Sequence, residues 1–377
     1  MSEISDFALL LLPVAAGLAL AILSMRLPLP APGLFLLAAA LVPGDPLGTQ
    51  AVERIAVVAL VVILLNGGMD IGWARMRRSV NPVMSLGVLG TFLTAGLIAV
   101  VAHAVLGFSW TLAGIVGAAL APTDPAVVFS VLGGTRIRGR AGTILEGEAG
   151  VNDPAGIALM LGMIELATHD DATLLNVVSD FGIEMAVGVA LGFLGARVLA
   201  PFVRLGSEQM RPVLLLALAV VLYAVTSLAH GSGFLAVFVA GLVLGDDDLR
   251  VQGFTQPLAG LAEIVVFVTL GLTIDLTGLP ASAWRDGAIL TLALVFAIRP
   301  IVVAITLAQA RLEPGDRAFV AWSGLKGAVP ILLAAFAVLD GVEGAETVYG
   351  IVFVAVLFSV FGQGGLVPAV ARRVLRT

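Results

Sequence analysis

A succession of long apolar segments constrains this chain more than any other feature of its sequence. Hydrophobic residues make up 59% of the 377 residues and charged residues only 12%, whereas soluble domains contain about 25% charged residues. A membrane-spanning helix needs about 20 mostly apolar residues, and such segments follow one another along the chain. The sequence therefore predicts an all-α polytopic membrane protein. It has no cysteine for disulfides or thiolate metal sites.

The apolar pattern predicts about thirteen membrane-spanning helices. The N-terminal segment lacks a basic region, which favours a retained first span over a cleaved signal peptide. The predicted spans lie near residues 6–24, 31–43, 51–69, 82–106, 109–133, 142–166, 174–202, 211–229, 232–245, 255–276, 286–310, 316–340 and 346–371.

The arginines predict the orientation of these spans. Most of the 20 basic residues follow odd-numbered spans or lie in the C-terminal tail, and only Arg54 and Arg285 lie in the loops of the other side. Since cytoplasmic loops carry an excess of Lys and Arg, we expect a multi-pass protein of the cell (inner) membrane. Its N-terminus is predicted outside and its C-terminus in the cytoplasm. Nothing in the sequence indicates nucleic-acid binding.

Proline and glycine interrupt two of the predicted spans. Span 5 contains Ala-Pro-Thr-Asp-Pro at 121–125, and span 12 contains Ser-Gly-Leu-Lys-Gly-Ala-Val-Pro at 323–330. Proline removes a backbone donor and glycine permits non-helical angles, and paired interruptions in two halves indicate a transporter site. Spans 1–6 and 8–13 are offset by seven. Because seven is an odd number, the second half would enter the membrane with the opposite topology. The sequence therefore predicts two inverted six-helix repeats with discontinuous helices 5 and 12.

Charges inside the predicted spans are candidate functional residues, because each one near mid-bilayer costs at least ~2.5 kcal/mol. Asp124 precedes Pro125 and suits the N-cap of the second half of span 5; a structural cap and an ion-binding role both remain open for it. The candidates are Asp124, Glu148, Asp153, Glu263, Arg299 and Lys326.

Span 6 carries the strongest candidate. Glu148 and Asn152 are four residues apart and share a helix face, and Pro154 directly follows Asp153. Two acids and an amide beside a proline-induced helix break suit a small, partly dehydrated cation, since oxygen ligands match hard cations. Burial favours the protonated form of a carboxylic acid, so Asp153 is predicted to exchange a proton for a cation. The alternative is a structural salt bridge to Lys326 or Arg299.

Two further charges have structural interpretations. Lys326 lies in the second helix break, where a cation can neutralise half-helix ends and nearby carboxylates. Arg299 and Glu263 are expected to pair across adjacent antiparallel helices.

Four motifs, in the expected spans and order, resemble the cation:proton antiporter-1 family of sodium/proton and potassium/proton antiporters. The resemblance covers nearly the whole chain and is closest to the potassium/proton branch. The motifs are Thr123-Asp124-Pro125, Glu148 with Asn152-Asp153, Arg299-Pro300, and Gly-Leu-Lys-Gly-Ala-Val-Pro at 324–330.

The resemblance implies a fold in which the two discontinuous helices cross. It implies a single transmembrane exchanger domain, 1–377, with a mobile core subdomain and a dimer-forming scaffold subdomain. The core would hold residues 82–166 and 286–371, and the scaffold residues 6–69 and 211–276, joined by a linker helix at 174–202. A homodimer in the lipid bilayer follows from the same resemblance.

The resemblance also assigns roles. Asp153 would carry the cation and the proton in turn, with Asn152, Asp124 and oxygens near Thr123 completing the site for a monovalent cation.

Glu148 would pair with Lys326, where the family usually has arginine. Two other departures remove oxygen or charge near the ion: Ala149 stands where sodium-selective members often have a hydroxyl residue, and Asn66 where many have an acid. Both bear on cation selectivity more than on antiport.

The predicted function is therefore electroneutral exchange of K⁺ and/or Na⁺ for H⁺ by alternating access, without a cofactor. Two alternatives stay open: a cation channel or uniporter, and a sodium-coupled symporter of an organic anion. A symporter should offer more polar or cationic groups to its solute. The chain has no Gly-x-Ser-x-Gly or His-Glu-x-x-His motif, so an enzyme is not expected.

Overall fold

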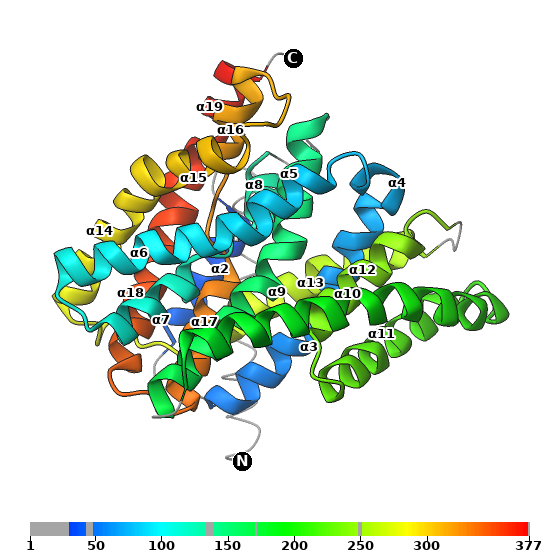
Figure 1. The fold of residues 1–377 in the computed structure, drawn as a ribbon, viewed down its shortest axis with the longest axis horizontal. Coiled ribbons are helices and arrows are strands. Elements are labelled where there is room, and N and C mark those ends of the chain that lie inside the picture. The colour runs from blue at the N-terminus through cyan, green and yellow to red at the C-terminus, as the bar shows by residue number, and fades with distance from the viewer. Residues whose placement is uncertain (1–29, 43–47, 133–138, 170–171, 248–250, 376–377) are drawn as a thin grey trace.

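The computed structural model describes residues 30–42, 48–132, 139–169, 172–247 and 251–375. Within these ranges the chain forms helices and no β-strand. Seven helical segments there are long and apolar enough to cross a membrane, which confirms the predicted all-α membrane architecture (Figure 1). The predicted first span, 6–24, lies outside the described residues.

Every other predicted span corresponds to one helix or to consecutive helices. Seven correspond to single α-helices, and α4 (Trp73–Met76) is a short extra turn after α3. The seven are α2 (Ala31–Ala40), α3 (Thr49–Ile71), α9 (Arg140–Thr168), α10 (Leu174–Leu205), α11 (Arg211–Leu228), α12 (Gly233–Leu244) and α13 (Gln252–Gly271).

Three long spans each contain a turn of π-helix, which inserts an extra residue into the helical ladder and is a known cause of bending. The first consists of α5 (Val80–Met84), a π turn (Ser85–Leu89) and α6 (Gly90–Leu106). The second consists of α14 (Ala281–Ala293), a π turn (Leu294–Ile298) and α15 (Arg299–Thr306). The third consists of α18 (Ala345–Leu357), a π turn (Phe358–Gln363) and α19 (Gly364–Val374).

The two predicted interruptions are present, and they lie against each other. Span 5 divides into α7 (Trp110–Leu120) and α8 (Pro125–Val131), and span 12 into α16 (Pro314–Trp322) and α17 (Ala328–Leu339). The backbone N–H of Asp124 donates to the carbonyl oxygen of Leu325 over 2.8 Å, which joins the two breaks directly. The crossed, discontinuous helices are therefore confirmed.

The expected break at Pro154 is wrong, because α9 (Arg140–Thr168) continues through this residue. Proline here removes one hydrogen bond, the one that its missing N–H would donate to the carbonyl of Gly150. Most of the residues around Pro154 in α9 are buried, and tertiary packing of this kind supplies most helix stability in proteins.

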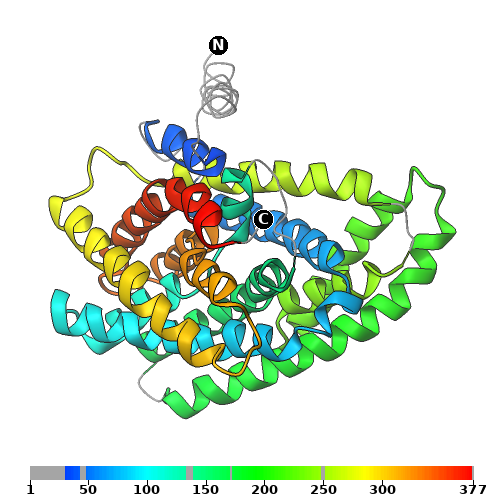
Figure 2. The ribbon, with the colours of Figure 1, turned by 90° about the horizontal axis from the view of Figure 1, so that it is seen from above.

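Tertiary contacts divide most of the helices into two groups. In one group, α3 packs against α12 and α13, α13 also packs against α2, and α12 packs against α10. In the other, α7 packs against α6 and α9, while α18 packs against α14 and α17. Figure 2 shows α13, in yellow-green, running alongside the blue α3.

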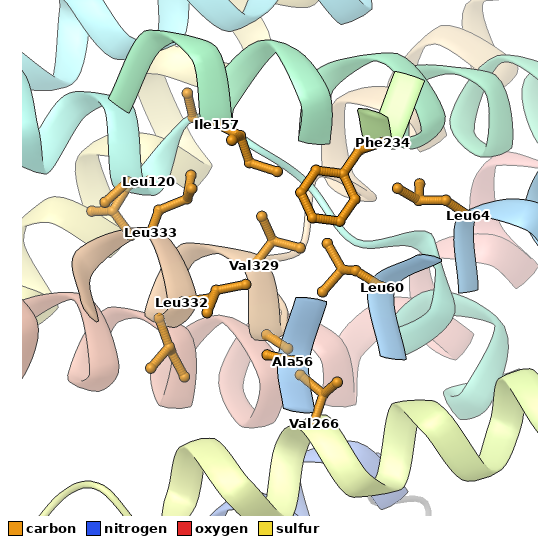
Figure 3. Packing of buried hydrophobic residues seen from close by; sticks show 14 of the residues in the cluster. Ala56, Leu60, Leu64, Leu120, Ile157, Phe234, Val266, Val329, Leu332 and Leu333 are labelled. Carbon is orange, nitrogen blue, oxygen red and sulfur yellow. The ribbon is translucent and has the colours of Figure 1, made fainter. Parts of the chain in front are cut away.

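An apolar cluster joins the two groups (Figure 3). Side chains of α3 and of α13 meet side chains of α7, α9 and α17 there, and all of them are buried. The labelled members are Ala56, Leu60 and Leu64 on α3, Leu120 on α7, Ile157 on α9, Phe234 on α12, Val266 on α13, and Val329, Leu332 and Leu333 on α17.

Glycine sets the distance between α3 and α12. A Cβ atom added at Gly241 would lie 2.5 Å from the carbonyl oxygen of Leu65 and 3.2 Å from the Cα of Gly68. Both are backbone atoms, so no side-chain rotation can make room. We predict that Gly241→Ala lowers the melting temperature of the purified protein, at a cost of about 1–3 kcal/mol typical of overpacking.

Gly96→Ala is the matched control, because a Cβ atom at Gly96 meets nothing within 4 Å. Alanine is the better helix former by about 0.5–1 kcal/mol, so this variant should melt at the wild-type temperature or above it. Thermal unfolding in detergent, followed by intrinsic fluorescence, makes the comparison. Equal melting temperatures for the two variants would contradict the close approach of α3 and α12.

Candidate functional site

A buried polar network connects α9 to the break between α7 and α8. Asn152 Nδ2 donates to Thr123 Oγ1 over 2.8 Å, and Thr123 Oγ1 donates to Glu148 Oε1 over 3.3 Å. All three residues are buried. Glu148 and Asn152 lie one helical turn apart on α9, as their spacing predicted, and the break places Thr123 opposite them. The network therefore fixes α9 against the unwound segment of span 5.

Arg299 neutralises Glu148. Its Nη1 donates to Glu148 Oε1 over 2.5 Å and its Nη2 to Glu148 Oε2 over 2.8 Å, and the two side chains are 3% and 2% exposed. Arg299 Nη2 also donates to the carbonyl of Val320. This two-pronged geometry is the strong form of a carboxylate–guanidinium pair. The predicted pairing of Glu148 with Lys326 is wrong, because the longer, forked side chain from α15 reaches both carboxylate oxygens.

Lys326 instead serves the helix break. Its Nζ donates to the carbonyl oxygens of Ala121 (3.0 Å) and Pro122 (2.8 Å), which directly follow the C-terminus of α7. Its backbone N–H donates to Ser359 Oγ over 2.9 Å. A cation at a helix C-terminus is stabilising because it faces the negative end of the helix dipole. The structure thus contains the predicted neutralisation of a half-helix end, by Lys326 at the C-terminus of α7.

Glu263 does not pair with Arg299, so that prediction is also wrong. Arg299 is engaged by Glu148, whereas Glu263, on α13, lines a cavity. The cavity has a volume of about 460 Å³ and lies between α3, α8, α9, α12 and α13. Glu263 therefore shares a cavity with Asp153, the candidate ion carrier, and takes no part in the buried Glu148–Arg299 salt bridge.

The cavity brings five carboxylates together, and the described residues that line it include no lysine, arginine or histidine. The carboxylates are those of Asp70, Asp124, Glu146, Asp153 and Glu263, and the lining also includes the amides of Asn66 and Gln256. Because like charges in a cleft with apolar walls focus the electrostatic field, this cavity favours entry of small cations.

Asp153 faces this cavity, one residue along α9 from the buried network. Within the described part of the chain, its carboxylate forms neither a hydrogen bond nor an ion pair. Asp124, which directly precedes α8, and Gly150, whose carbonyl Pro154 leaves without a helical donor, line the same space. Of the residues that sequence reasoning placed at the ion, Asn152 and Thr123 do not line the cavity and lie in the network behind it.

Sequence reasoning missed four polar residues of the cavity: Asp70, Ser130, Glu146 and Gln256. Asp70 accepts hydrogen bonds from Asn66 (3.2 Å) and Gln256 (3.5 Å), and Glu146 lies 3.8 Å from Arg75. Each lies near the end of an apolar segment, where polar residues are usually solvated. No sequence signal therefore distinguished them from ordinary helix-end residues.

The pairing of the buried charges predicts how substitutions of these residues combine in their effects on thermal stability. Arg299→Ala strands Glu148, and removal of one partner of a buried pair typically costs about 3–5 kcal/mol. We expect a marked loss of thermal stability, part of which returns when Glu148→Ala is added. Lys326→Ala should also destabilise, but its coupling to Glu148→Ala should be smaller, because Lys326 donates to carbonyl oxygens. A double-mutant cycle on melting temperatures measures both couplings; a larger coupling for Lys326 would contradict the assignment.

Comparison with known proteins agrees with these features. Residues 12–373 match a family described as sodium/hydrogen exchanger, transmembrane. The K(+)/H(+) antiporter NhaP2 of Shewanella sp. (strain ANA-3) is 32% identical over 84% of this chain and 56% of its own length. The K(+)/H(+) antiporter NhaP of Alkalimonas amylolytica is 33% identical over 86% of this chain and 58% of its own length. The chain thus spans a little over half the length of these curated relatives.

A solved structure shares the fold. The sodium proton antiporter MjNhaP1 from Methanocaldococcus jannaschii at pH 8 superposes with a TM-score of 0.84, over 100% of both chains, at 24% sequence identity. The family match covers nearly the whole chain and includes both helix breaks and the cavity-lining acids. This chain therefore belongs to the sodium/hydrogen exchanger family of transmembrane proteins.

Proposed function

We propose that this chain is a secondary active antiporter that exchanges a monovalent cation for a proton, with Asp153 as the carrier that both ions share. One observation supports this most directly: Asp153 faces an acidic cavity without a basic partner, while Glu148, a few residues away, is held by Arg299. An acid in that position can be neutralised either by a proton or by a cation. Competition for one carboxylate is all that coupled exchange requires.

The surrounding groups prevent Glu148 from exchanging a proton for a cation. Glu148 is bound at both oxygens and cannot release Arg299 without leaving two buried charges unpaired. Lys326 is held by the carbonyls of Ala121 and Pro122. Asp153 combines access to the cavity with freedom from such bonds to the described residues. Oxygens of the same cavity wall, including the Gly150 carbonyl, would complete the shell of a cation that has shed part of its water.

Alternating access follows from the asymmetry of the site. The cavity lies on one side of Asp153, and the apolar cluster of Figure 3 packs α3 and α13 against α7, α9 and α17. We infer that the core (82–166 and 286–371) moves against the scaffold (6–69 and 211–276), with 174–202 as the linker. This movement would open the apolar cluster as it closes the cavity. The packed cluster argues against a continuous pore, and therefore against a channel.

The cavity is proposed to open to the cytoplasm. Three polar residues line it close to helix ends: Asp70 near the end of α3, Glu146 near the start of α9 and Gln256 near the start of α13. The segment directly after α3 carries Arg75, and basic residues mark cytoplasmic loops. The protein would then lie in the cell (inner) membrane with its N-terminus outside and its C-terminus in the cytoplasm, as a homodimer formed through the scaffold.

For the transported cation, we propose that potassium is carried at least as well as sodium. Ala149 and Asn66 both line the cavity and lack the hydroxyl and the charge that a small, strongly hydrated ion would use. The names of the two most similar relatives described above, both K(+)/H(+) antiporters, support the same choice. The cation and the proton are substrates, and the proposal includes neither a cofactor nor an enzymatic reaction.

Asp153→Asn should abolish coupled exchange while the protein stays folded, because asparagine cannot bind and release a proton. The measurement is pH-gradient-driven exchange in proteoliposomes with K⁺, Na⁺, Rb⁺ and Li⁺, alongside the melting temperature. Asp247→Asn is the control, since Asp247 pairs with Arg204 over 2.9 Å outside the cavity. Near wild-type exchange by Asp153→Asn would exclude Asp153 as the carrier, and exchange of Na⁺ or Li⁺ without K⁺ or Rb⁺ would overturn the cation preference.

Transport should be electroneutral, because one carrier carboxylate exchanges one proton for one monovalent cation. The membrane potential, worth about 2.3 kcal/mol per charge per 100 mV, then does no work on the cycle. Solid-supported membrane electrophysiology should detect no sustained current in the presence of a cation gradient. A steady current that scales with an imposed potential would rule out one-for-one exchange.

A further inference from the structure

Glu263 holds a buried carboxylate oxygen without a partner. Its Oε1 is shielded from solvent and accepts no hydrogen bond within the described part of the chain. Its side chain lines the acidic cavity from α13, whereas Asp153 lines it from α9. Because buried polar atoms in folded proteins are nearly always hydrogen-bonded, each exception needs an explanation such as an ion.

Asn66 presents a second oxygen of the same kind. Its Nδ2 donates to Asp70 Oδ2 over 3.2 Å, which fixes the orientation of the amide. Its Oδ1 is buried and unpaired among the described residues. Asn66 lies on α3, which packs directly against α13, and it lines the same cavity as Glu263. Two adjacent helices therefore each place a residue with an unsatisfied oxygen in the wall of one cavity.

The ligand of these oxygens should be a cation. Asp124, which lines the same cavity, is itself an acid, and the described residues of the lining include no lysine, arginine or histidine. A carboxylate and an amide oxygen are the hard ligands that alkali cations prefer over nitrogen or sulfur donors.

We propose that Asn66 and Glu263 form a subsite for a monovalent cation on the α3–α13 wall of the cavity, distinct from the carrier Asp153. This inference rests on the proposed antiport and adds the residues that bind the cation before it reaches Asp153. Glu263 supplies the negative charge of the subsite, and Asn66 supplies an oriented oxygen. The subsite sets the apparent affinity for the cation, while Asp153 sets the coupling to the proton.

The test compares half-saturating cation concentration and maximal rate in proteoliposomes at one fixed pH. Glu263→Gln keeps the shape of the side chain and removes the charge. It should raise the half-saturating concentration about tenfold, equivalent to ~1.4 kcal/mol, with a maximal rate within about twofold of wild type. Asp247→Asn, which removes a carboxylate outside the cavity, should change neither value. Asn66→Asp combined with Glu263→Gln moves the charge from α13 to α3 and should restore much of the affinity.

A second readout does not need transport. Stabilisation of the purified protein by KCl or NaCl, with choline chloride as the ionic-strength control, reports binding to the folded state. Glu263→Gln should shift this stabilisation to higher cation concentration. If Glu263→Gln fails to fold, Glu263→Asp, which shortens the side chain by one methylene, should raise the half-saturating concentration in its place.

The possible outcomes separate the subsite from the proposed function. Wild-type half-saturation in the folded Glu263 variant would overturn the subsite, as would an equal shift in Asp247→Asn. In either case, exchange by the wild type would leave the antiporter assignment intact. Absence of exchange by the wild type with every cation tested would instead overturn the antiport on which the subsite rests.

Discussion

The compensation of buried charge around the two helix breaks is the constraint on which the rest of the site depends. Unwound backbone and ionised side chains are both unfavourable inside a membrane unless other protein groups satisfy them. Here Arg299 satisfies Glu148, and Lys326 satisfies the carbonyls that follow α7. The backbone bond from Asp124 to Leu325 then joins the two breaks. With these groups paired, the carboxylate of Asp153 beside them faces the cavity without a hydrogen bond or ion pair to a described residue.

Close packing and the cavity depend on the same few helices. Glycine at position 241 lets α12 touch the backbone of α3, while the other faces of α3 and α13 contribute to the acidic cavity and to the apolar cluster. The wall of the cavity is thus held by backbone contacts, and its polar side chains need not provide stability. This arrangement lets oxygens such as Glu263 Oε1 and Asn66 Oδ1 remain unpaired within the described structure.

Family membership and the geometry of the site together restrict the chemistry that this cavity can support. The sodium/hydrogen exchanger family match spans 12–373, and the crossed breaks occur in a chain that shares the fold of a solved antiporter. The distribution of charge in the cavity adds what the family alone does not specify. Acids come from both helix groups, with Asp153 on α9 and Glu263 on α13. A cation held between them would contact both parts that the proposed cycle moves.

The sequence alone determined the all-α architecture of the described residues, the two interruptions and the membrane-embedded acids, because apolar length, proline, glycine and isolated charges are local signals. It did not determine which charges meet. The predictions that Glu148 pairs with Lys326 and that Glu263 pairs with Arg299 were both wrong, and so was the prediction of a helix break at Pro154. Spacing along one helix fixes which residues share a face. Only the crossing of helices distant in the sequence decided that the guanidinium of Arg299 reaches Glu148, and that Glu263 faces the cavity of Asp153.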